Sequence, residues 1–347
     1  MRKTALVAAL LVLRLAAAVA AEDKNLLSLA NDLGAQLEWD PLRDTGVLVV
    51  GDDRIALGVG SDSALINYRR KVAIDAPVRR NGAVWLTTAA VTAISAAVQG
   101  DRLAHAGERM RVACILIDAG HGGKDSGGVG TYARGKTRVT LMEKSVTLSV
   151  ATSLGALLKT RYPDKQVLFT RTDDTFVSLE DRVAIANALL DKTKDTVLYV
   201  SIHANISPFN KEASGFEVWC LPPSYQRKLL DEKSAGKENA DILPVLNSML
   251  EEEISLESTV LAQEILKGLD RSIGQKSADR GLRQNDWYVV RNTRMPAVLT
   301  EVGFISNPDE AARLADPAYL NDVATGMYSG IDAFIARFER GGSPGAR

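Results

Sequence analysis

Apolar positions are spaced differently in different parts of this chain. From residue 112 to 304, short continuous apolar runs alternate with stretches whose apolar residues recur every three or four positions. The runs predict buried strands, and the stretches predict amphipathic helices. Buried strands with helices between them are typical of a parallel sheet covered on both faces. We therefore predict an α/β fold for residues 110–339, with an open, mostly parallel sheet and helices on both of its faces.

The individual elements follow from the same pattern. Strands are predicted at 112–118, 166–171, 197–204, 215–221, 287–291 and 297–304, and helices at 146–158, 179–190 and 319–334. Residues 222–256 interrupt the alternation with a charged insertion, and the glycine-rich tail 340–347 is predicted to be disordered.

Residues 22–106 have a shorter rhythm. Alternating runs at 46–53, 54–60 and 83–91 predict strands, and 24–34 predicts a helix that Gly34 ends. We predict a small β-rich or α+β module here. The polar stretch 99–109 is predicted to be a linker.

The first 21 residues are typical of a secretory signal peptide. Arg2 and Lys3 precede an apolar run that ends in small residues, which predicts cleavage after Ala20 or Ala21. The alternative is an uncleaved membrane anchor. We expect an exported protein, periplasmic or associated with the cell wall, with no stable membrane span after cleavage.

Charge and cysteine content narrow the choice of partners only slightly. Lys and Arg number 42 against 43 Asp and Glu, which gives a net charge of -1 and disfavours nucleic acid as the main partner. Cys114 and Cys220 lie in apolar, strand-like runs and are expected to be buried thiols. An exported chain would also permit a disulfide between them, and the sequence leaves this open.

A glycine-rich loop follows the strand at 112–118, with the sequence AGHGGKDSGG. Nearby, residues 130–137 satisfy the phosphate-loop pattern G-x-x-x-x-G-K-[ST]. That motif works only where a strand enters the loop directly and a helix leaves it. Here the strand ends near Ile117 and other glycines intervene, so we do not expect a nucleotide site. A plain flexible turn and a metal site remain.

The histidines favour the metal site. His121 directly follows one predicted strand and His203 lies near the end of another, so both are expected at the carboxyl edge of the sheet, where ligands bind in α/β folds. Glu143 opens the helix that leaves the loop. Two histidines, one carboxylate and an open position make a catalytic zinc set. His105, the third histidine, lies in the polar linker and is expected at the surface.

Glu301 ends another apolar strand, in VLTEVGF. A charged carboxylate there would be costly to bury without a purpose, so we predict that it is the catalytic base. A plain turn would explain the glycines, but not the expected meeting of Glu301 with the three metal ligands.

These residues lie in segments that resemble a known family. The segments IDAGHGGKDSG, EKSVTLSVA, FTRTDD, SLEDRVAIAN, SIHAN, GFEVW and MPAVLTEVGFISN are similar, in this order, to zinc-dependent N-acetylmuramoyl-L-alanine amidases of bacterial cell-wall turnover. The resemblance covers about 112–337. It implies zinc on His121, Glu143 and His203, Glu301 as catalytic glutamate, and peptidoglycan as substrate.

The resemblance also implies roles for other residues. The bond cut would be the amide between N-acetylmuramic acid and L-alanine. Asn205, two residues after His203, is expected to contact substrate or the metal's surroundings, or to be structural. Arg171 and Arg182 match family positions and are expected to form ion pairs or packing contacts.

Two segments depart from the family pattern. Residues 129–141 have no counterpart in the family pattern, so the resemblance does not define which residues form the rim of the active-site cleft. The insertion 222–256 resembles, in position, the regulatory helix of division amidases, which blocks the zinc until an activator protein displaces it. Glu238 would supply the blocking carboxylate; a solvated charged loop is the alternative.

The module at 22–106 stands where exported amidases carry a wall-targeting domain. It also resembles the small first domain of copper amine oxidases, without a copper ligand set.

Two other functions remain as alternatives. A zinc peptidase that cuts within the stem peptide would use the same metal chemistry with different pocket contacts. An inactive peptidoglycan-binding protein would keep the fold, but it would not need a general base at Glu301.

Overall fold

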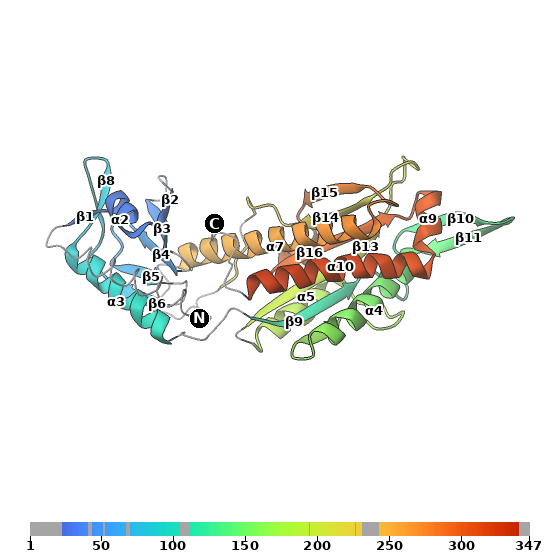
Figure 1. Cartoon of the computed structure of the whole chain (residues 1–347), viewed down its shortest axis with the longest axis horizontal. Coiled ribbons are helices and arrows are strands. Elements are labelled where there is room, and N and C mark those ends of the chain that lie inside the picture. Colours follow the sequence, from blue (N-terminus) through green and yellow to red (C-terminus); the bar gives the residue numbers. More distant parts are fainter. Residues whose placement is uncertain are drawn as a thin grey trace. The chain divides into compact units, whose positions relative to one another are not determined.

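The computed structural model describes residues 23–40, 44–50, 53–66, 70–104, 111–193, 195–225, 227–230 and 243–339 (Figure 1). Tertiary contacts divide the chain into two compact units, with the boundary between Glu108 and Arg109. Each unit has its own buried apolar core. The second unit contains all the residues that the sequence nominated for chemistry and that the structure describes.

A six-stranded sheet forms the centre of the second unit, with strand order β12-β9-β13-β16-β14-β15. The strands are β9 (Val112–Ala119), β12 (Gln166–Phe169), β13 (Thr196–Asn205), β14 (Phe216–Cys220), β15 (Asp279–Gln284) and β16 (Ala297–Phe304). Four of the five neighbouring pairs are parallel, and only β14 runs antiparallel to β16. The predicted α/β fold with a mostly parallel sheet is confirmed.

Helices cover both faces of this sheet (Figure 1). The large helices α4 (Glu143–Arg161), α7 (Leu243–Ile273) and α10 (Pro317–Phe338) share one core with alternate residues of the central strands. On the other face, α5 (Leu179–Leu190) and the short α8 (Tyr288–Asn292) enclose a smaller core that includes Tyr199 and Leu299. The short α9 (Pro308–Leu314) follows β16. Both faces of β9, β13 and β16 are therefore buried, which explains their continuous apolar runs.

Three elements differ from the sequence prediction. Residues 287–291 were predicted as a strand, but they form most of α8, because a short apolar run cannot distinguish a strand from a buried helical turn. The edge strand β15 was missed because it has one partner strand and four exposed residues. The helix α7 was not predicted: it begins inside the predicted insertion, and its buried polar residues Glu251, Ser255 and Ser258 hide the apolar period.

The segment 129–142 is an antiparallel hairpin of β10 (Val129–Arg134) and β11 (Thr137–Met142). Gly135, with φ 62°, lies in its turn. A strand therefore leaves the phosphate-loop pattern where a helix would be needed, which confirms that this match was accidental.

The described residues of the first unit form two antiparallel sheets and two helices. One sheet has the order β1-β8-β7 and the other β2-β3-β4-β5-β6. Their bounds are Lys24–Asn25 (β1), Gln36–Asp40 (β2), Thr45–Val50 (β3), Asp53–Gly58 (β4), Ser63–Ile66 (β5), Arg70–Ala73 (β6), Val78–Arg80 (β7) and Ala83–Leu86 (β8), with helices α2 (Leu26–Leu33) and α3 (Thr88–Ala104). Asn25 caps the start of α2, and Gly34 ends it with φ 63°, as predicted.

The strand predicted at 83–91 ends early. Only Ala83–Leu86 is extended, and α3 begins at Thr88 because the Thr87 hydroxyl accepts a hydrogen bond from the Ala90 amide. The same helix continues to Ala104, so the first half of the predicted linker 99–109 is helical.

Cys114 and Cys220 are both buried free thiols. They lie on β9 and β14, with β13 and β16 between those strands, so they are too far apart for a disulfide. In the described part of the chain, no helix combines the length and the apolar character needed to cross a membrane. The signal segment 1–21 and the tail 340–347 lie outside the described residues.

Glycines allow α7 and α10 to pack in direct backbone contact. A Cβ atom at Gly268 would lie 2.1 Å from the Gly326 carbonyl oxygen, and one at Gly330 would lie 2.4 Å from the Glu264 carbonyl oxygen. Backbone atoms cannot yield as a flexible side chain can, so any larger residue must push these helices apart.

We therefore expect Gly330→Ala to lower the free energy of opening of α7 and α10 by about 2 kcal/mol, the usual cost of overpacking. Hydrogen exchange of their peptides, followed by mass spectrometry, measures this locally. Thr325→Ala, on the exposed side of α10, is the control and should leave protection unchanged or slightly higher. Equal protection in the Gly330→Ala protein would contradict the close contact.

Candidate active site

Four of the predicted site residues converge at the carboxyl end of the parallel strands. His121 lies two residues beyond β9, and Glu143 is the first residue of α4. His203 on β13 and Glu301 on β16 are register partners on neighbouring strands. The sheet thus brings together side chains that are separated by up to 180 positions in sequence.

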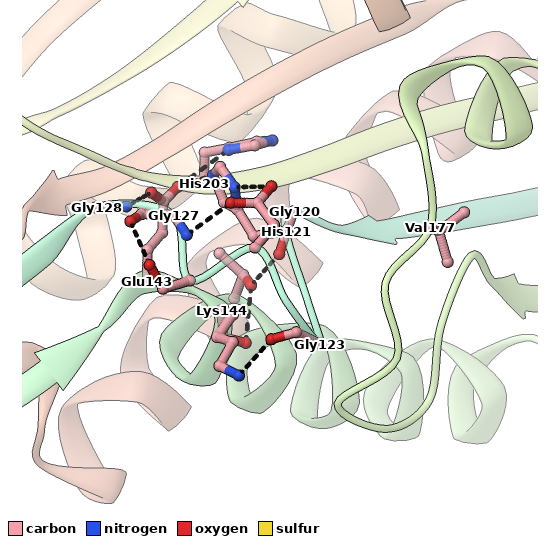
Figure 2. A network of polar contacts seen from close by, with 12 residues as sticks. Gly120, His121, Gly123, Gly127, Gly128, Glu143, Lys144, Val177 and His203 are labelled. Carbon is pink, nitrogen blue, oxygen red and sulfur yellow. Dashed lines mark hydrogen bonds and ion pairs between the residues drawn. The ribbon is translucent and has the colours of Figure 1, made fainter.

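Glu143 lies between the two histidines (Figure 2). Its Oε1 atom is 3.0 Å from His203 Nδ1 and 3.1 Å from His121 Nε2. Burial alone would raise the pKa of Glu143, but hydrogen bonds and charge interactions with His121 and His203 lower it far below its ordinary value. The carboxylate is therefore ionised at neutral pH.

Backbone amides fix the orientation of this carboxylate. The Ala204 amide donates to Oε1 at 3.0 Å, and the Gly128 amide donates to Oε2 at 2.7 Å. One ligand atom from each of His121, Glu143 and His203 lies within 4.8 Å of the others, so the three residues could share one metal ion.

Two glycines make this approach possible. A Cβ atom at Gly120 would lie 2.4 Å from the His203 ring, and one at Gly127 would lie 2.6 Å from both Glu143 Oε2 and the His121 ring. Gly127 also has φ 64°, a conformation that disfavours other residues. The glycines therefore provide space for the site as well as backbone freedom.

His121 itself has φ 62°, an uncommon value for a residue with a side chain. Two buried arginines hold its backbone there. Arg182 donates to the carbonyls of Ala119 and His121, and Arg171 donates to those of Ala119 and Gly120. Arg182 also forms an ion pair with Asp118, and Arg171 bonds to the Thr147 hydroxyl, which agrees with the ion-pair or packing role predicted for the two arginines.

The partner of Arg182 is Asp118, which is fully buried. Hydroxyls of Thr170, Tyr199 and Ser201 also donate to Asp118, at 2.6 to 2.7 Å. Burial would raise the pKa of Asp118, but Arg182 and these hydroxyls lower it. This ion pair connects the end of β9 to α5, and so positions the loop that carries His121.

Asp125 contacts His121 from the other side of the ring. Its Oδ2 lies 2.8 Å from His121 Nδ1, and its Oδ1 accepts from the Gly127 amide. Burial would lower the pKa of His121, but Glu143 and Asp125 raise it. Asp125 had no predicted role, although an acidic residue four positions after a candidate ligand was a usable signal.

Glu301 is almost completely buried, at 9% exposure, and its Oε2 has no hydrogen-bond partner among the described residues. Burial, followed by the nearby charges of Glu143 and Glu217, raises the pKa of Glu301 well above its ordinary value. An unpartnered buried carboxyl beside a cluster of metal-ligand type is a candidate for proton transfer.

Asn205 lies at the end of β13, but its amide points to another acidic residue. Its Nδ2 donates to Glu217 Oε1 at 2.7 Å, and its Oδ1 accepts from the Ile206 amide. Glu217 on β14 is the register partner of Glu301 on β16. Glu217 had no predicted role. Its single charge within the apolar run FEVWC was the sequence signal that could have indicated one.

The start of the predicted insertion is fixed to the rest of the unit. Arg227 donates to both carboxylate oxygens of Glu251 on α7 and to the Thr293 carbonyl. Glu238, the predicted blocking residue, and His105 lie outside the described residues.

Comparison with known proteins agrees with this geometry. The family model described as N-acetylmuramoyl-L-alanine amidase matches residues 115–333. The chain is 36% identical over 217 residues to an endolysin of Bacillus phage SPP1, a match that covers 62% of this chain and 64% of the endolysin. It is 31% identical over 239 residues to the N-acetylmuramoyl-L-alanine amidase AmiA of Salmonella typhimurium, covering 65% of this chain and 77% of that enzyme.

A solved structure gives the same result. The crystal structure of an N-acetylmuramoyl-L-alanine amidase from Clostridium difficile matches with a TM-score of 0.50 and 28% identity, over 65% of this chain and 98% of that one. The family match includes all four converging residues, His121, Glu143, His203 and Glu301. This chain belongs to the N-acetylmuramoyl-L-alanine amidase family.

Proposed function

We propose that this chain hydrolyses the amide bond between N-acetylmuramic acid and L-alanine in peptidoglycan, with zinc on His121, Glu143 and His203 and with Glu301 as the general base. The observation that carries the proposal is the convergence of three ligand atoms within 4.8 Å beside the buried Glu301 carboxyl group, whose Oε2 has no hydrogen-bond partner among the described residues. Family membership supplies the substrate.

The donor set fits zinc. Two imidazole nitrogens and one carboxylate oxygen are the ligands of many catalytic zinc sites, which keep a further position open. The lowered pKa of Glu143, against the effect of its burial, keeps this ligand ionised. Asp125, as the acceptor for Nδ1–H of His121, would leave Nε2 as the nitrogen that binds the metal and raises the basicity of the ring, a frequent arrangement around metal-binding histidines.

Zinc bound here would polarise the amide carbonyl and acidify a water molecule. The protein's own contribution is proton transfer by Glu301. Its Oε2 takes the proton from the attacking water and delivers it to the leaving nitrogen of L-alanine. A raised pKa suits the second transfer, in which the protonated carboxyl group delivers its proton to the leaving amine. The positive charge of bound zinc would lower this pKa, so that the carboxylate is ionised for the first transfer.

We also propose that the enzyme is exported and acts in cell-wall turnover or daughter-cell separation, with the module at 22–106 directing it to the wall. The segment 222–256 would regulate the site through Glu238, and an activator protein would relieve the block. The described part of the segment supports an ordered role, because Arg227 forms a buried ion pair with Glu251 on α7.

Incubation with purified peptidoglycan tests the proposed reaction. The wild-type protein should release stem peptides with an L-alanine amino terminus and leave the glycan strands intact. Glu301→Ala should lower turnover by roughly 10²- to 10⁴-fold, the usual contribution of a general base, while one zinc per chain remains bound. Mass spectrometry of the fragments and elemental analysis of both proteins measure this.

Other products would identify other functions. Cuts within the stem peptide would show a peptidase, and binding without cleavage would show a wall-binding protein. Loss of zinc from Glu301→Ala would make Glu301 a ligand rather than the base.

Asp125→Asn should weaken zinc binding by about 10- to 100-fold, because it removes the carboxylate that orients His121. Competition with a chromogenic chelator measures the affinity. The control is Asp286→Asn, which removes a surface carboxylate paired with Arg291. Equal zinc affinities for the wild type and the Asp125→Asn protein would show that Asp125 has no role at the metal.

Glu238→Ala should raise basal hydrolysis several-fold if Glu238 blocks the zinc, because the metal then becomes open to substrate without an activator. Asp241→Ala, three residues later, is the control and should have no effect. Unchanged activity in Glu238→Ala, together with full activity after deletion of 224–252, would reject the block and leave a solvated charged loop.

A further inference from the structure

Two arginines on the edge strand β15 converge on one buried carboxylate beside the catalytic glutamate. Arg280 Nε donates to Glu217 Oε2 at 2.9 Å, and Arg283 Nε lies 3.8 Å from the same oxygen. The side chain of Glu217 is 3% exposed, whereas those of Arg280 and Arg283 are 35% and 48% exposed. The carboxylate is thus covered, and the two guanidinium groups are accessible to a ligand.

The charges in this group do not balance. Glu217 carries one negative charge against two positive charges, and its second oxygen is already occupied by the neutral amide of Asn205. Among the described residues, Arg283 makes no hydrogen bond and has Glu217 as its ion-pair partner. One positive charge is therefore left over, and it can bind an anion that comes from solvent.

Arg280 is held in place before any ligand arrives. Its Nη1 donates to the Ser214 carbonyl at 3.3 Å, and its guanidinium lies over the Phe304 ring at 4.8 Å. These contacts and the bond from Nε to Glu217 leave Nη2 for another acceptor. Less side-chain entropy is lost on binding when a donor is already fixed in this way.

The strand order sets the distance between these arginines and Glu301, the proposed general base. In the order β13-β16-β14-β15, Glu301 on β16 and the arginines on β15 are two strands apart. Neighbouring strands lie about 4.8 Å apart, so the separation is about 10 Å. An extended peptide covers about 3.3 to 3.6 Å per residue. A group two to three residues beyond the scissile amide can therefore reach the arginines.

We propose that Arg280 and Arg283 bind a free carboxylate of the stem peptide, and so determine which peptidoglycan the enzyme prefers. This inference rests on the proposed amidase function. In peptidoglycan, the second stem residue is a glutamate linked through its side chain, so its α-carboxyl group is free unless it is amidated. The third residue carries another free carboxylate where it is diaminopimelate and none where it is lysine.

The test uses the zinc-loaded full chain and soluble muramyl peptides that differ only in these groups. One pair has the α-carboxyl of the second residue free or amidated; another has diaminopimelate or lysine as the third residue. Wild-type enzyme should favour the free carboxylate of one pair by about ten-fold in kcat/KM, as expected for a charge-assisted hydrogen bond. The pair that shows the preference identifies the carboxylate that is bound.

Arg283→Gln should remove most of that preference. It should lower kcat/KM for the substrate with the free carboxylate alone, mainly because KM for that substrate rises. Arg283→Lys should restore part of it. Lys267→Gln, which removes an exposed charge from α7 on the opposite face of the sheet, is the matched control and should keep the full preference.

A wild-type enzyme that cleaves all four substrates equally would overturn the inference, as would an Arg283→Gln protein that loses activity equally on all of them. Neither result would affect the amidase function. Failure of both the wild type and the Glu238→Ala protein, in which the proposed block is removed, to cleave any substrate would instead reject the proposed function itself.

Discussion

The site depends on the position of a single buried carboxylate, that of Glu143. Two imidazoles approach one of its oxygens, and backbone amides from β13 and the glycine loop orient both. A buried charge is costly unless it is paired and hydrogen-bonded, and these four contacts offset that cost. Because Glu143 begins α4, the start of this helix is determined by the same contacts that place the ligand.

Around this carboxylate, the structure restricts movement with buried ionic contacts rather than with apolar packing. Arg182 and Arg171 donate to successive carbonyls of the loop between β9 and Gly122, and Asp118 holds Arg182 in place. Removal of one partner of a buried pair leaves an uncompensated charge. Such a network holds the backbone of a glycine-rich loop in one conformation, and a metal site needs ligands that are held in this way.

Charge also varies systematically across the sheet. From β13 to β15, the same end of the sheet presents a histidine, the buried Glu301, the paired Glu217, and then two arginines. The carboxyl groups lie where proton transfer is proposed, and the positive surplus lies at the open edge. A substrate that is neutral at the scissile amide and anionic further along would match this gradient.

The sequence alone predicted the sheet, the helices α4, α5 and α10, and the residues His121, Glu143, His203 and Glu301, because apolar periodicity and strand ends are local signals. Residues 287–291 were mistaken for a strand, and β15 and α7 were missed, where exposure at an edge or buried polar residues remove the periodicity. The roles of Asp125, Glu217 and the β15 arginines came only from the tertiary structure. Each of these residues acts through a neighbour that another element, or the fold of its own loop, brings into contact with it. Contacts of this kind produce no regular spacing of residue types along the sequence.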